Sequence, residues 1–290
     1  MSLLTSSAGG ILTPEQVNAL VVVPVQRASV IYQASQLVVT RSKDYRFPIL
    51  SEDPSAAWVL EGEEIPIDDA VVDELVVTPK KVAGLQPISR ELATDSLNES
   101  AAETLGAALA RDIAKRVDQA AFKLDTPANA PAGLHSLADH EISVVDATAG
   151  VTNLDPFAEG ISLAEQQGAV PTAWVASPTT ALQLAKLKRE ADSNEQLLQP
   201  DPTLPTRRAI AGVPLLVSPA VEDFEIWGIP GTPDTAGAFS FVVQAQEATL
   251  DVDKSVYFTS DRLAIRATLR VAFGWPHTKA VVRIDLPDGS

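Results

Sequence analysis

One long amphipathic segment constrains the fold of this chain more than any other feature. Between residues 96 and 124, apolar side chains recur at helical spacing along one side. Ser96 and Glu99 match a capping box, in which each side chain satisfies a free backbone N–H at the other residue. At 1.5 Å rise per residue such a helix is roughly 40 Å long, and Pro127 prevents its continuation. The sequence therefore predicts a fold built around one unusually long helix.

The two sides of this helix differ in chemistry. The apolar stripe consists of Leu97, Ala101, Leu105, Leu109, Ile113, Val117 and Ala121. The charged residues expected to lie mostly away from this stripe are Arg111, Lys115, Arg116 and Asp118. One side should therefore face a core and the other should present positive charge.

Residues 43–80 are predicted to form a long β-hairpin. Tyr45, Phe47 and Ile49 alternate with polar or small residues, the period of a half-buried strand, and residues 71–77 fit a return strand. No lysine or arginine occurs between Arg46 and Lys80, whereas acidic residues are frequent. A connection of this length without helices is uncommon in a compact domain and is usually functional or disordered.

The acidic run has two interpretations, a solvated loop or an arm that lies on a neighbouring subunit. In the second, Trp58 is the aromatic anchor, and complementary charge fixes the register between subunits. The candidate contacts on the arm are Trp58, Glu61, Glu63, Glu64, Asp68 and Asp69. The candidate basic partners are Arg111, Lys115 and Arg116 on the long helix and Arg27 and Arg41 near the N-terminus.

The N-terminal residues 1–42 are loosely patterned. Thr13 and Pro14 fit the start of a helix. The apolar residues between 30 and 38 fit either a short helix or a strand. We expect an arm with little core of its own, or else a disordered leader.

The remainder alternates between helices and strands, which by itself supports an α+β fold with two lobes. Helices are predicted over residues 155–167 and from Pro178 onward. Strands are predicted over residues 173–176, 212–217, 239–243, 262–270 and 280–284. Residues 200–208 and 228–237 are rich in proline or glycine and are predicted to be loops.

Composition excludes several classes of function. The formal net charge of −16 argues against wrapping nucleic acid, because affinity for phosphates comes mostly from lysine and arginine. An acidic wall is still compatible with enclosing nucleic acid. Cysteine is absent, so disulfides and thiolate metal sites are excluded. No membrane span or signal peptide is expected, and the protein is expected to be made in a cytoplasm.

No catalytic or cofactor-binding pattern is present. The sequence has no nucleophile elbow, no phosphate-binding lysine loop and no dinucleotide glycine fingerprint. His135, His140 and His277 do not have metal-ligand spacing and are expected in loops or at the surface. We therefore expect no enzyme activity, no metal and no cofactor.

The order of these segments resembles the major capsid proteins of tailed bacteriophages, which have the Hong Kong 97 fold. The resemblance lies in residues 58–64, 78–85, 88–96 and 131–134, together with the long helix. It implies an extended loop that leads through a lysine-containing strand and a short helix into a spine helix. It also implies peripheral and axial domains. The implied ranges are 1–42 for the N-terminal arm, 43–80 for the extended loop (E-loop), 81–140 and 248–290 for the peripheral domain, and 141–247 for the axial domain.

The resemblance implies pentamers and hexamers of an icosahedral phage head that encloses double-stranded DNA without sequence-specific binding. Scaffolding, portal and decoration proteins are the implied partners, with assembly in the host bacterial cytoplasm. The recognisable pattern begins within the first tens of residues, so a scaffold is either unnecessary or a separate protein. One alternative is an encapsulin-type compartment around enzyme cargo, and another is an acidic enzyme without a recognisable signature.

The chain departs from those family members that join subunits by an isopeptide bond from an extended-loop lysine. No lysine occurs between Lys43 and Lys80. Assembled material boiled in denaturant should therefore run as one band at the monomer mass of 30.7 kDa on a denaturing gel. A ladder of ligated species would show that the prediction is wrong.

Overall fold

The computed structural model describes residues 22–52, 58–59, 62, 71–89, 100–188, 198, 208–231, 239–246 and 248–287. It is a mixed helix and sheet structure, as predicted. The α-helices are α2 (Val23–Ala28), α3 (Val30–Ala34), α5 (Ser100–Phe122), α6 (Asp155–Gln166) and α7 (Pro178–Ala185). Short 3-10 helices are η2 (Leu134–Ser136), η3 (Phe258–Ser260) and η4 (Thr278–Ala280). Among the described residues the strands form three sheets.

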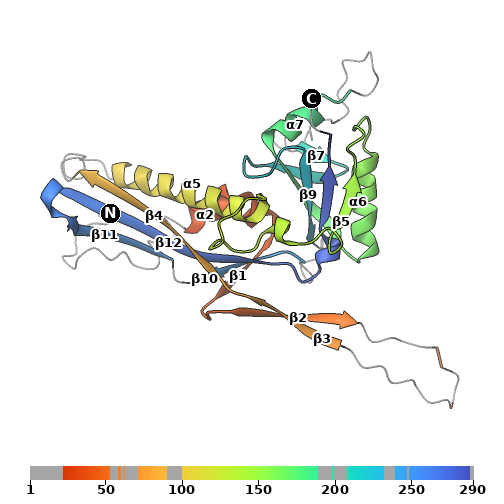
Figure 1. Ribbon diagram of the computed structural model, residues 1–290, viewed down its shortest axis with the longest axis horizontal. Coiled ribbons are helices and arrows are strands. Elements are labelled where there is room, and N and C mark those ends of the chain that lie inside the picture. The colour runs from red at the N-terminus through yellow and green to blue at the C-terminus, as the bar shows by residue number, and fades with distance from the viewer. Residues whose placement is uncertain are drawn as a thin grey trace.

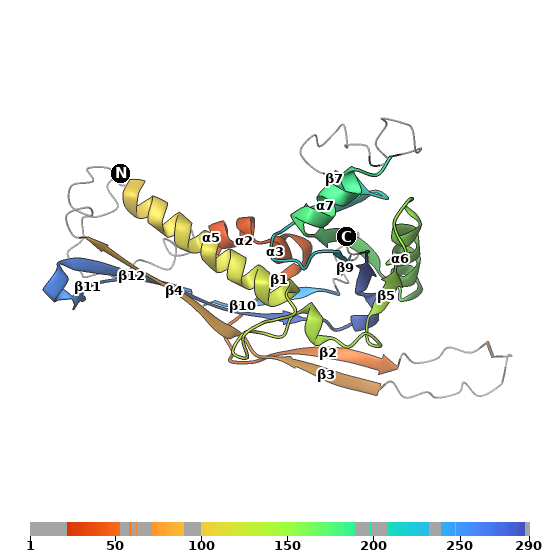
Figure 2. The same ribbon diagram turned by 45° about the horizontal axis from the view of Figure 1, so that its top comes forward.

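The long helix is confirmed over Ser100–Phe122, while its predicted capping pair lies outside the described residues. It packs on one face of a five-stranded sheet (Figures 1 and 2). This sheet contains β1 (Gln36–Thr40), β4 (Lys80–Ser89), β10 (Phe241–Ala245), β11 (Thr249–Tyr257) and β12 (Arg262–Gly274). Ile113 and Val117 of the stripe join Leu269 in the shared core, so the periodicity identified the buried side correctly.

A second lobe surrounds a six-stranded sheet in the order β5-β13-β9-β6-β8-β7. These strands are β5 (Ser143–Asp146), β6 (Val170–Ala176), β7 (Arg208–Ile210), β8 (Val213–Val217), β9 (Glu225–Gly231) and β13 (Val282–Asp285). Helices α6 and α7 supply Phe157 and Leu184 to its core. The N-terminus of α7 is capped by Ser177, whose Oγ accepts a hydrogen bond from the N–H of Thr180 at 3.1 Å.

The third sheet is the predicted hairpin, formed by β2 (Tyr45–Glu52) and β3 (Val71–Val77). Both views show it projecting from the five-stranded sheet on the side away from α5 (Figures 1 and 2). Its base is anchored by Phe47, which packs with Val243 and Ala272. A Cβ at Gly274 would lie 2.6 Å from the Phe47 ring, so only glycine gives the ring this position. The base of the hairpin is therefore held in place against the five-stranded sheet.

The segment near the N-terminus contributes more core than expected. It contains both a short helix, α3, and a strand, β1, so the two alternatives hold for successive residues. Val25 and Ile31 are fully buried in the same cluster as α5. The expectation of an arm with little core is thus wrong for residues 22–34, because α2 and α3 cover a side of α5 that the sheet leaves open. The predicted helix start at Thr13 lies outside the described residues.

The prediction of a loop from residue 228 is also wrong for residues 228–231, which belong to β9 in the middle of the six-stranded sheet. These glycines serve close packing and do not form a turn. A Cβ at Gly228 would lie 2.6 Å from the ring of Trp174, and one at Gly231 would lie 2.5 Å from Thr172. Glycine in a strand interior often marks such an approach.

Gly228→Ala should therefore lower the free energy of unfolding by about 1–3 kcal/mol, because a methyl group is forced against a fully buried indole. Urea unfolding followed by circular dichroism measures this. In a Trp174→Phe background the same substitution should cost less, since the ring atoms that clash are absent. Equal costs in the two backgrounds would contradict the packing explanation.

Candidate interaction surfaces

The arm presents a single large aromatic side chain beyond the hairpin. Trp58 is fully exposed, with a relative exposed area of 105%. The acidic residues predicted as contacts, namely Glu61, Glu63, Glu64, Asp68 and Asp69, lie outside the described residues. On the hairpin itself Asp73 and Glu74 are exposed, and Glu74 pairs with Arg46 at 2.8 Å. An exposed tryptophan on an extended arm is typical of an interface anchor.

The predicted basic partners fall on different elements. Arg111, Lys115 and Arg116 are exposed together along the outer side of α5, as the periodicity predicts. Arg27 is exposed at the end of α2, a helix that packs against α5. Arg41 follows β1 and donates a hydrogen bond to Gln246. The structure therefore groups the three cations of α5 and leaves Arg41 on the sheet.

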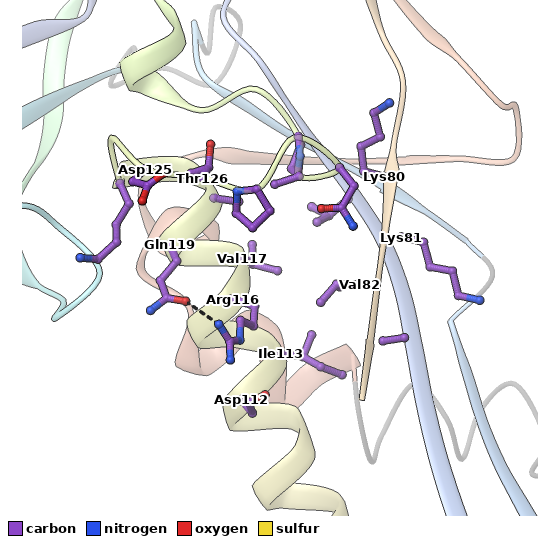
Figure 3. Close-up of a pocket in the computed structure, with 18 residues that line it drawn as sticks. Lys80, Lys81, Val82, Asp112, Ile113, Arg116, Val117, Gln119, Asp125 and Thr126 are labelled. Atoms are coloured by element: carbon purple, nitrogen blue, oxygen red, sulfur yellow. Dashed lines mark hydrogen bonds between the residues drawn. The ribbon is translucent and has the colours of Figure 1, made fainter. Parts of the chain in front are cut away.

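A pocket of about 630 Å³ lies between the second half of α5, the start of β4 and the loop after the helix (Figure 3). Val82 from the strand and Ile113 and Val117 from the helix face one another across it (Figure 3). Charged groups of both signs surround this apolar interior. They are Lys80, Lys81, Arg116, Lys123, Asp112 and Asp125.

Of these pocket residues, sequence reasoning singled out only Arg116 as a contact. One signal in the sequence did point to this pocket. Pro127 and Pro131 prevent the helix from continuing, and the chain then turns back beside it. The pairing of β4 with β12 could not be read from spacing, although it places Lys80 opposite Val271. Lys123 of the lining approaches Glu222, which lies outside the lining, at 3.6 Å, and Arg116 donates to Gln119 within the lining at 3.4 Å.

Asp118 was expected away from the apolar stripe, and this is wrong because the residue is only 4% exposed. Its carboxylate accepts hydrogen bonds from Ser29 Oγ at 2.5 Å and from the N–H groups of Val30 and Ile31 at 3.1 and 3.3 Å. Ser218 Oγ donates to it at 3.4 Å. The residue is buried because α2 and α3 pack on a second side of α5.

Burial raises the pKa of Asp118 above its ordinary range, and these hydrogen bonds offset the effect only in part. The carboxylate ties three segments together: the long helix, the start of α3 and the Ser218 loop, which follows β8. Asp118 is therefore a structural group that fixes α2, which carries Arg27, relative to α5, which carries Arg116.

One histidine is also placed differently from the expectation of a loop or surface residue. His135 lies in η2, and its side chain is 8% exposed, with Nε2 3.1 Å from Glu225 Oε2. Its ring packs edge-on against Trp227, and Arg283 lies over the same indole. Arg283 also pairs with Asp139 and Asp285, both at 2.9 Å. This cluster joins the loop after α5 to the six-stranded sheet.

The described residues contain no group of three or more histidine, aspartate or glutamate side chains placed to hold a metal ion. Within the same part of the chain, no helix combines the length and apolar character needed to cross a membrane. The arrangement offers surfaces for binding, namely an exposed aromatic arm and a pocket with charged edges.

Comparison with known proteins identifies what shares this fold. The model of the Phage capsid family matches residues 9–286. A chain from Mycobacterium phage Adephagia is 19% identical, with a TM-score of 0.69 over 90% of this chain and 91% of that one. The capsid of a native GTA particle computed with C5 symmetry is 16% identical, with a TM-score of 0.68 over 99% and 96% of the two chains. No curated protein matches.

Replacing Asp118 tests its structural role. Asp118→Ala should lower the free energy of unfolding by about 3 kcal/mol, because two backbone N–H groups and two hydroxyls lose their buried acceptor. Asp112→Ala is the matched control, since it removes an exposed aspartate from the same helix and should change stability by less than about 0.5 kcal/mol. Equal effects would contradict the assigned role.

The raised pKa also predicts a dependence on pH. The folded state holds the Asp118 proton more tightly than the unfolded state, so its stabilising contribution is complete below the unfolded pKa. That contribution is lost as pH rises through the folded-state pKa. The stability of the natural protein relative to Asp118→Asn should therefore fall as pH increases from acidic values. Chemical denaturation at a series of pH values measures the difference, and a rise would show that the sign is wrong.

Proposed function

The chain belongs to the phage capsid family, and we propose that it is the major capsid protein of an icosahedral phage head enclosing double-stranded DNA. The observation that carries the proposal is the family match, which extends over residues 9–286 and so includes both lobes and the arm. This is a family of structural proteins and not a class of enzymes. The solved capsids with the same fold cover about nine-tenths or more of this chain.

We propose that the subunits form pentamers and hexamers. One supporting observation is that the GTA capsids with this fold were computed with C5 symmetry. A second is the shape of the molecule, in which a narrow hairpin extends from one side (Figure 1). A contact between this arm and a different surface of the next copy is heterologous, and heterologous contacts close into rings when the rotation permits.

The proposed organisation is Hong Kong 97-like, with α5 as the spine helix and β2–β3 as the E-loop. The peripheral domain would then hold the five-stranded sheet, and the axial domain would hold most of the six-stranded one. The proposed domain ranges follow the sheets except at three strands. β1 and β10 pair within the five-stranded sheet, although the ranges place β1 in the N-terminal arm and β10 in the axial domain. β13 pairs within the six-stranded sheet, although its range belongs to the peripheral domain.

The acidic arm is proposed to lie on a neighbouring subunit. Its partners are drawn from the exposed cations Arg111, Lys115, Arg116, Arg27 and Arg41. Complementary charge of this kind accelerates encounter and fixes orientation more than it adds affinity. Since exposed pairs are screened over about 8 Å at physiological salt, assembly should weaken as salt increases.

The proposed contents are DNA held without sequence-specific contacts, consistent with a net charge of −16. The proposed location is the virion capsid, assembled in the host bacterial cytoplasm with scaffolding, portal and decoration proteins as partners. The encapsulin alternative is not favoured, because the matching family and the solved structures of this fold are phage and GTA capsids.

Negative-stain electron microscopy of the chain expressed alone and separated by size tests the proposal. Rings or closed shells are the expected result. Nucleic acid or scaffold inside would support a phage head, whereas a co-purifying enzyme inside would support a compartment. Only small ligand-binding monomers, even after coexpression with neighbouring genes, would overturn it.

A further inference from the structure

We propose that the pocket between α5 and β4 receives Trp58 of a second copy of this chain. The inference rests on the proposed function and specifies which surface the arm contacts. It selects Arg116 from the predicted basic partners and excludes Arg111 and Lys115, which lie on α5 outside the pocket lining.

The pocket has the chemistry of a site for an aromatic anchor. Its volume of about 630 Å³ falls within the range of roughly 300–1,000 Å³ that is usual for clefts binding compact ligands. Val82, Ala130 and Pro131 of its lining keep exposed apolar surface, so an indole placed there contacts apolar groups from β4 and from the loop after α5 at once. Interface tryptophans contribute most when the contact excludes water from them.

The occupant is identified by exposure and by charge. Trp58 is the one fully exposed tryptophan, because Trp174, Trp227 and Trp275 are all buried. In sequence it is followed closely by Glu61, Glu63 and Glu64. The pocket edge carries four cations, Lys80, Lys81, Arg116 and Lys123, against two carboxylates, Asp112 and Asp125. An aromatic residue followed by carboxylates therefore complements an apolar pocket whose edge has a net positive charge.

The tryptophan comes from a second copy of the chain, because the arm of each subunit leads away from the pocket of the same subunit. β4 begins at Lys80, three residues after β3 ends at Val77, so the pocket lies at the base of the hairpin. The strands then run outward for roughly 20 Å at 3.3 Å per residue, away from α5 (Figures 1 and 2). A contact from the outer end of one arm to the base of the next arm is heterologous, as a ring requires.

Disulfide trapping between copies tests the contact without background, because the chain has no cysteine. One variant carries Val59→Cys, which places the thiol beside Trp58 without removing the indole, and a second carries Ala130→Cys, a small residue in the pocket lining. The two are coassembled, oxidised and run on a non-reducing denaturing gel. We expect a crosslinked dimer that contains one chain of each variant.

The matched control replaces Ala130→Cys with Lys115→Cys, an exposed residue on α5 that lies outside the pocket lining. We expect at least roughly tenfold less dimer with this control, since disulfides need Cα atoms within about 7 Å. Crosslinking to position 115 and not to position 130 would overturn the inference in favour of the outer side of α5. Particles without either crosslink would also overturn it, while the proposed capsid function would stand. Failure of the natural chain to form particles would instead count against the proposed function.

Quenching of tryptophan fluorescence provides a second measurement that needs no cysteine. In the free subunit acrylamide should quench Trp58 and leave the three buried tryptophans largely protected. Assembly should remove most of this quenching, and Trp58→Ala should lower particle yield roughly tenfold or more, whereas Val59→Ala should not. Unchanged quenching in assembled particles would overturn the inference, whether or not the cysteine variants assemble.

Discussion

The structure depends on the packing of α5 between two different partners. The five-stranded sheet covers one side of the helix, and α2 and α3 cover another, so its second half is buried over a wider arc than a simple amphipathic helix. Asp118 lies on the added arc, where it accepts hydrogen bonds from the start of α3 and from Ser218. A buried carboxylate is stable only when its acceptor sites are filled, so this residue requires the three segments to meet.

That packing also determines what the outer surface offers. Because two sides of α5 are covered, Arg111, Lys115 and Arg116 are left on the remaining side. The same helix forms one wall of the pocket beside β4. The base of the hairpin is held by Phe47 against the sheet that α5 covers. The base of the arm and the pocket are therefore attached to the same sheet, which suits a subunit that must repeat its contacts around a ring.

Some parts of the candidate site were accessible from the sequence and others were not. The exposed cations of α5 follow from helical periodicity, and the hairpin follows from alternation between residues 45 and 49. The pocket residues Lys80 and Lys123 did not stand out, because their proximity arises from β4 pairing with β12 while the chain turns back after the helix. His135 and Glu225 are ninety residues apart in sequence and meet only because η2 packs on β9. Non-local pairs of this kind leave no spacing pattern.

The sequence by itself determined the long helix, the acidic hairpin, the alternation of the second lobe and the resemblance to phage capsid proteins. These depend on local periodicity, on turn chemistry and on the order of segments along the chain. Tertiary structure alone decided that Asp118 is buried, that Gly228 lies in a central strand and that the N-terminal segment joins the core. In each case the deciding contact is distant in sequence: Ser218 for Asp118, Trp174 for Gly228 and α5 for Ile31. Local propensity is a weak preference that such contacts override, because burying a group and satisfying it are energetically larger effects.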